Sequence, residues 1–67
     1  MMPVVFLMLI AFWAPNSIQP VRVESASFAT EDECDARVMQ LDAEWTERVH
    51  GGSTSWLCVG AFAGPST

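Results

Sequence analysis

No charged residue occurs before Arg22, so the start of the chain belongs to a different physical class from the rest. Residues 1–14 are continuously apolar apart from Pro3, and the prolines at 15 and 20 end the run. As a helix, this run would be about 21 Å long at 1.5 Å per residue. The hydrocarbon core of a bilayer is about 30 Å thick, so the run is short for a membrane span. We therefore predict an apolar N-terminal helix of the kind found in secretory signals.

Three interpretations of residues 1–20 remain open. The leading one is a signal peptide that is removed after export. The second is an uncleaved short anchor that contacts the membrane through residues 1–14. The third is a buried helix or strand of a cytosolic protein. No Lys or Arg precedes the run, and Ala14-Pro15 is a poor cleavage site. We assign residues 1–20 to a signal peptide or membrane anchor and residues 21–67 to a separate small domain.

The charge balance excludes two classes of partner. The chain has 3 basic residues against 8 acidic ones, and its net charge is −5. Binding to nucleic acid needs clustered Lys and Arg that displace counterions from phosphates, so no nucleic-acid partner is expected. Docking on an anionic membrane surface needs a polybasic patch, which is also missing.

Residues 21–50 carry the clearest signals of local structure. Val21 to Phe28 alternates apolar and polar residues as a half-buried strand does, with a change of phase near Ala26 that a bulge or turn would allow. Thr30 and Glu33 form a capping box at the start of a helix over residues 31–50, which Gly51-Gly52 ends. One apolar stripe follows this helix at the helical period: Cys34, Val38, Leu41, Trp45 and Val49.

A second strand is predicted at residues 56–63, after a polar lead-in and before a frayed tail at 64–67. It places Trp56, Cys58 and Phe62 on one face. The order strand, helix, strand predicts an α+β fold in which the helix stripe covers the sheet, and the connection is long enough to join parallel strands. Trp45 and Trp56 are expected in the core, although one of them could form an exposed binding patch with Phe62.

The two cysteines are predicted to form a structural disulfide. Cys34 begins the helix stripe and Cys58 lies on the strand face that the stripe would cover, so the two thiols can meet. A domain this small buries little apolar surface and usually needs a stabilising cross-link such as a disulfide. Closing the loop would stabilise the fold by about 3.5 kcal/mol on the chain-entropy estimate. The bond requires an oxidising compartment, and two inert buried thiols are the alternative.

No catalytic, cofactor-binding or metal-binding residue is assigned. Cys34 and His50 would lie about 24 Å apart at opposite ends of the helix, which excludes a catalytic dyad. Cys58 with His50 lacks an orienting third residue, and these three side chains lack the CxxC pair and fourth ligand of a zinc site. The acidic residues between 31 and 35 lack calcium-loop spacing and suit the positive end of the helix dipole.

The pattern Phe28-x-Thr30-x-x-x-Cys34, opening an amphipathic helix and followed by a cysteine on a later strand, resembles many small uncharacterised exported proteins of bacteria and their phages. The resemblance covers residues 21–63 and rests on a short motif. It implies a periplasmic or secreted location and a Cys34–Cys58 bridge, and it brings no known activity.

These observations lead to one expected function and two alternatives. The expected function is that of a small exported, non-enzymatic domain that binds another protein. The first alternative is a membrane-tethered protein whose N-terminal helix associates with a larger membrane complex. The second is a cysteine-dependent enzyme or redox protein.

Overall fold

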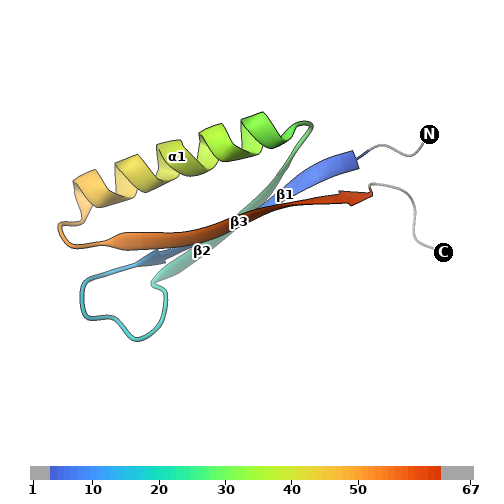
Figure 1. The fold of residues 1–67 in the computed structure, drawn as a ribbon. Coiled ribbons are helices and arrows are strands. Elements are labelled where there is room, and N and C mark those ends of the chain that lie inside the picture. Colours follow the sequence, from blue (N-terminus) through green and yellow to red (C-terminus); the bar gives the residue numbers. More distant parts are fainter. Residues whose placement is uncertain (1–3, 63–67) are drawn as a thin grey trace.

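The computed structural model describes residues 4–62, which form a three-stranded antiparallel sheet with one helix packed on it (Figure 1). The elements are β1 (Val4–Trp13), β2 (Arg22–Phe28), α1 (Glu31–Arg48) and β3 (Ser53–Phe62). The strand order is β2-β1-β3, so the first strand of the chain is the central strand of the sheet. The predicted α+β class is confirmed.

The predicted apolar N-terminal helix is wrong, because residues 4–13 form β1. This strand pairs with β2 on one side and β3 on the other, and Leu9 lies between Ser25 and Leu57. A continuously apolar run has no period by which a helix can be told from a strand. The neighbouring strands decide the outcome, since they satisfy the backbone of β1 along both edges. The run therefore forms a strand that is buried on the side facing α1 and partly exposed on the other. Residues 1–3 lie outside the described residues.

α1 begins where the capping box predicts and ends slightly earlier than expected. The hydroxyl of Thr30 accepts a hydrogen bond from the backbone N–H of Glu33 at 3.1 Å. The helix ends at Arg48, and the N–H of Val49 donates to the carbonyl of Trp45 at 2.8 Å. Acidic residues fill the first turn, where the helix dipole favours them. Four residues of the predicted stripe face the sheet: Cys34, Val38 and Leu41 are buried and Trp45 packs against them, whereas Val49 lies beyond the end of the helix in extended backbone.

β2 and β3 both run antiparallel to β1, so they point the same way without being neighbours. The helical connection between them therefore crosses over β1. The pairing of β2 with β1 continues without a break from Phe28 to Arg22, so the change of phase near Ala26 involves no bulge. β3 begins at Ser53 and includes the residues expected as a polar lead-in. Ala63 and the predicted tail at 64–67 lie outside the described residues.

The core lies between β1 and α1, and β1 supplies half of it. The buried side chains are Met8, Ile10, Phe12, Cys34, Val38 and Leu41. Trp45 packs against this core as predicted, with its ring 5.2 Å from that of Phe12. Trp56 was expected in the core, but half of its surface is exposed. Phe62 is more exposed still, because β1 and β3 extend past the start of α1 (Figure 1).

Candidate functional site

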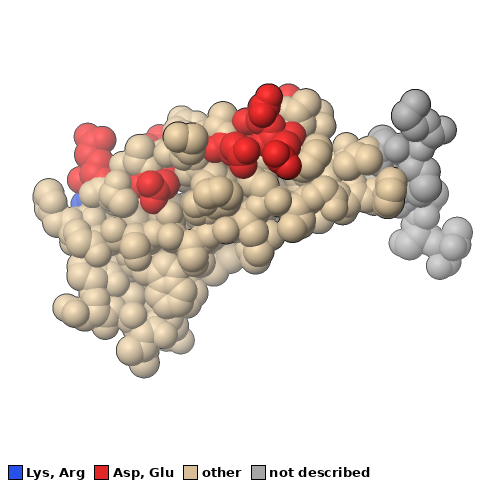
Figure 2. Space-filling view, in the orientation of Figure 1, with Lys and Arg blue, Asp and Glu red and all other residues tan. Residues whose placement is uncertain are grey.

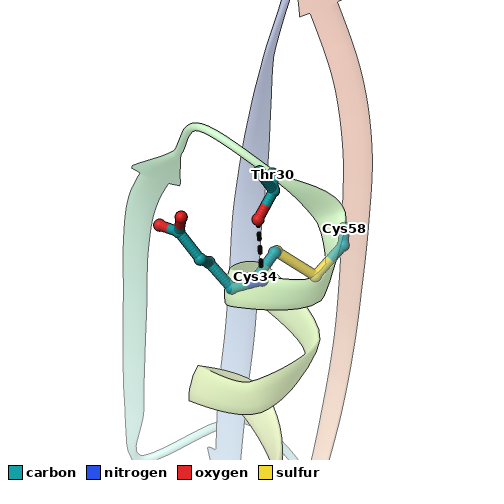
Figure 3. Close-up of a disulfide and its surroundings, with 4 residues drawn as sticks. Thr30, Cys34 and Cys58 are labelled. Atoms are coloured by element: carbon teal, nitrogen blue, oxygen red, sulfur yellow. Dashed lines mark hydrogen bonds between the residues drawn. A yellow bond between two sulfur atoms is a disulfide. The ribbon is translucent and has the colours of Figure 1, made fainter.

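A disulfide joins Cys34 in the first turns of α1 to Cys58 in the middle of β3 (Figure 3). The two Cα atoms lie 6.3 Å apart, within the range of about 4.4–6.8 Å that disulfides usually span. The predicted bridge is therefore confirmed. Cys34 is fully buried against the sheet, and the Thr30 cap fixes the turn that carries it. The bond closes 24 residues of chain and joins the helix to the sheet, which favours a structural role.

Little else in the described residues offers reactive chemistry. Both cysteines of the chain are bonded to each other, so neither presents a thiol while the bridge is intact. His50 is exposed in the turn after α1. Within residues 4–62, no three His, Cys, Asp or Glu side chains gather closely enough to hold a metal ion. Trp56 and Phe62 lie six positions apart on an extended strand, about 20 Å, so they do not form one binding patch.

The sheet has a second face, which we call the open face, on the side opposite α1. Side chains alternate along a strand, so the residues next to the buried ones of β1 point away from the helix. The strand register then places their neighbours on β2 and β3 on the same side. The open face consists of Val5, Leu7, Leu9, Ala11 and Trp13 from β1, Val23, Ser25 and Ser27 from β2, and Ser53, Ser55, Leu57, Val59 and Ala61 from β3.

Aliphatic side chains dominate the middle of the open face. Leu7 and Leu9 of β1 are 42% and 46% exposed, and Leu57 and Val59 of β3 are 46% and 47% exposed. They are direct cross-strand neighbours, Leu7 beside Val59 and Leu9 beside Leu57, so they form one continuous surface. A shallow depression runs between these four side chains and the small residues of β2. Among residues 4–62, no element covers this side of the sheet (Figure 1).

Charge is confined to the other side of the molecule. None of the open-face residues is charged. Figure 2 shows the acidic side chains gathered over α1, above a surface that is largely uncharged. On the sheet, the charged residues are Arg22 and Glu24 of β2, which form an ion pair at 2.9 Å. In the strand register they lie beside Phe12 and Ile10 of β1, whose side chains face the helix. The molecule therefore has one acidic side and one apolar side.

The open face was missed from the sequence, although a signal for it exists. The predicted strand at 56–63 placed Trp56, Cys58 and Phe62 on one side, and its other side, Leu57 with Val59, is equally apolar. A strand that is apolar on both sides is typical of a sheet covered on both faces. The continuously apolar run of β1 carries the same signal.

No helix in the described part of the chain combines the length and the apolar character needed to cross a membrane. Comparison of the sequence and the fold with protein-family models, curated proteins and solved structures finds no significant match.

Proposed function

We propose that this protein is a non-enzymatic binding domain that recognises another protein through the open face of its sheet. The observation that carries the proposal is the continuous aliphatic surface around Leu9 and Leu57, which has no charge and no cover within residues 4–62. Folded monomers rarely expose apolar patches of more than a few hundred Å², and larger ones commonly mark interaction sites. The matching partner surface is apolar and uncharged, because burying an unpaired charge against this face would be costly.

The chemistry available elsewhere favours binding over catalysis. A catalytic site needs a nucleophile or an acid–base pair held in a pocket. The cysteines form a disulfide, His50 is exposed, and the depression next to Leu9 is lined by aliphatic and serine side chains. These features support a role in recognition.

The bridge supports a location in an oxidising compartment, such as the periplasm or the extracellular space. Disulfides persist there and are rare where glutathione and thioredoxin keep thiols reduced. For a fold with so small a core, loss of the Cys34–Cys58 bond would remove a large share of the stability. The domain is therefore best suited to a compartment that keeps this bond formed.

Site-specific photo-cross-linking in the cells that make the protein tests the proposal. A benzophenone amino acid is placed at Leu9, at Leu57, or at Met39, which is exposed on α1 and serves as the control. We expect adducts of defined mass from positions 9 and 57 and none from position 39. Absence of adducts from both open-face positions, in protein that retains its disulfide, would refute binding through this face.

A further inference from the structure

We propose that the partner on the open face is a second copy of this chain, so that two sheets stack face to face in a symmetric dimer. This inference rests on the function proposed above and names the partner. Three features of the molecule favour a second copy: the location of its charges, the shape of the open face and the size of that face.

The location of the charges decides which surfaces two copies can share. All eight acidic residues lie on α1 or, in the case of Glu24, on the helix side of β2. In a face-to-face stack, the sheets are about 10 Å apart and each outer helix layer adds about 10 Å, so the two helices would be about 30 Å apart. At physiological salt the Debye length is about 8 Å, so their repulsion would be largely screened.

Pairing through the free edges of the sheets is less favourable. The outer edge of β3 is ten residues long and carries neither charge nor proline, so it could pair with another strand. α1 packs more closely on β3 than on β2, so a β3–β3 pairing would place two acidic helices side by side. That pairing would also leave both apolar faces uncovered. Stacking the open faces avoids the repulsion and removes the apolar surface from water.

The open face is complementary in shape to itself in one orientation. Beside Leu7 and Leu9, the β2 side is low, because Ser25 and Ser27 are small, and the β3 side is raised by Leu57 and Val59. Beside Ala11 the relation is reversed, with Val23 on β2 and Ser55 on β3. A two-fold axis parallel to β1 lays β2 of each copy on β3 of the other. Ser25 then lies opposite Leu57 of the partner subunit. An axis across the strands would instead place serine on serine and leave gaps.

The area is sufficient for a reversible dimer. With 3.4 Å per residue and 4.8 Å between strands, the footprint of the sheet is about 500 Å² per copy, or about 1,000 Å² for the pair. That is the lower limit for a specific interface, so the dissociation constant is expected in the range of about 1–100 µM. Because the charges of each copy, net −5, lie about 30 Å from those of the other, the dimer is expected to be weaker at about 0.01 M salt, where the Debye length is about 30 Å, and to change little above physiological salt.

Sedimentation equilibrium of the full, oxidised chain across this concentration range tests the dimer. The wild type is expected to reach twice its 7.3 kDa mass. Leu9→Lys is expected to weaken the dimer at least tenfold, whereas Met39→Lys adds the same charge on α1 and is expected to leave it unchanged. Ser25→Lys is a second disruptive variant on an exposed strand position, which preserves the test if Leu9→Lys does not fold. A wild type that stays monomeric at 500 µM would overturn the proposal. A loss of dimer affinity in Met39→Lys equal to that in Leu9→Lys would also overturn it.

A mixing experiment tests the orientation of the two copies. Ser25→Lys and Leu57→Glu should each be monomeric alone, because each places an unpaired charge in the apolar contact. Their equimolar mixture should regain the dimer, because the ammonium group introduced on β2 of one variant meets the carboxylate introduced on β3 of the other. No recovery in the mixture would overturn the axis parallel to β1.

Failure of the dimer is distinguishable from failure of the proposed function. A monomeric wild type that forms adducts from position 9 with a different protein would overturn the dimer and leave the binding function standing. A monomeric wild type that floats with phosphatidylcholine vesicles would show a lipid occupant and would also overturn the dimer. Dimerisation of the pure chain, with adducts at twice the chain mass from positions 9 and 57, would support both.

Discussion

The indole N–H of Trp45, near the end of α1, donates a hydrogen bond to the backbone carbonyl of Trp13, at the end of β1, at 3.0 Å. This bond connects the last turns of the helix to the central strand, whereas the disulfide connects the first turn of the helix to β3. The same indole ring packs on Phe12. Trp45 therefore holds together two elements that are distant in the sequence.

Replacing Trp45 with Phe should lower the free energy of unfolding by about 1–3 kcal/mol. The change removes the donor to the Trp13 carbonyl and part of the ring contact with Phe12. Trp56→Phe is the matched control, since Trp56 is half exposed, and it should cost less than about 1 kcal/mol. Guanidinium unfolding at one low protein concentration measures both. Equal losses in the two variants would contradict this role of Trp45.

Gly52 should tolerate no side chain, because the ring of Trp45 occupies the space. A Cβ atom on Gly52 would lie 2.7 Å from Nε1 of Trp45 and 3.0 Å from the carbonyl oxygen of Val49. Gly52→Ala is therefore expected to destabilise the fold by about 1–3 kcal/mol through displacement of the indole. In β3, a Cβ on Gly60 would make only ordinary contact with Phe6 at 3.4 Å. Gly60→Ala should be neutral or slightly stabilising in the same unfolding assay.

The disulfide should contribute more to stability than any single side-chain contact. Replacing both cysteines with Ala is expected to lower the free energy of unfolding by about 2–5 kcal/mol, enough to unfold much of the population of so small a domain. Loss of amide dispersion in a proton–nitrogen correlation spectrum reports this. Reduction of the wild type should reproduce the effect. If the double variant and the reduced wild type both keep native dispersion and stability, the bridge is dispensable.

The parts of the fold that were predicted correctly depend on local signals. The capping box at Thr30 and the stripe from Cys34 to Leu41 fix the helix and its buried face within one segment of chain. The disulfide followed because each cysteine could be assigned a face from its neighbours alone. The side-chain periods of about 2 residues in a strand and about 3.6 in a helix are enough for such assignments.

The parts that were missed depend on contacts distant in the sequence. β1 is apolar on both sides, since Ile10 faces α1 while Leu9 faces outward, so it shows no alternation. Its composition and length resemble those of a signal peptide, and only its pairing with two strands identifies it as the centre of a sheet. The open face was missed with it, because that surface exists only once β1 joins β2 to β3.

A fragment of residues 21–67, kept oxidised, is expected to be unfolded. It lacks Met8, Ile10 and Phe12, which are half of the six buried side chains. β2 and β3 also lose their only strand partner within the described residues. Circular dichroism and amide dispersion would report this against the full chain. A folded 21–67 fragment would show that β1 is dispensable and would support the separate domain expected from the sequence.

The intact mass of the native protein is the most informative measurement, because it reports whether the chain has been cleaved. Cleavage anywhere in residues 14–20 would remove β1, so the fold described here requires the uncleaved chain. The protein is isolated from its natural source, with oxidation blocked after lysis. We expect its intact mass to correspond to a chain that retains residues 4–13. We also expect this mass to be about 2 Da lower than that of the fully reduced chain, because the bridge lacks two hydrogens. A mass that corresponds to a chain beginning between residues 15 and 21 would establish that residues 1–20 are a cleaved signal peptide. The mature protein would then need a different fold. A retained N-terminus without the 2 Da difference would place the protein where the bridge does not form.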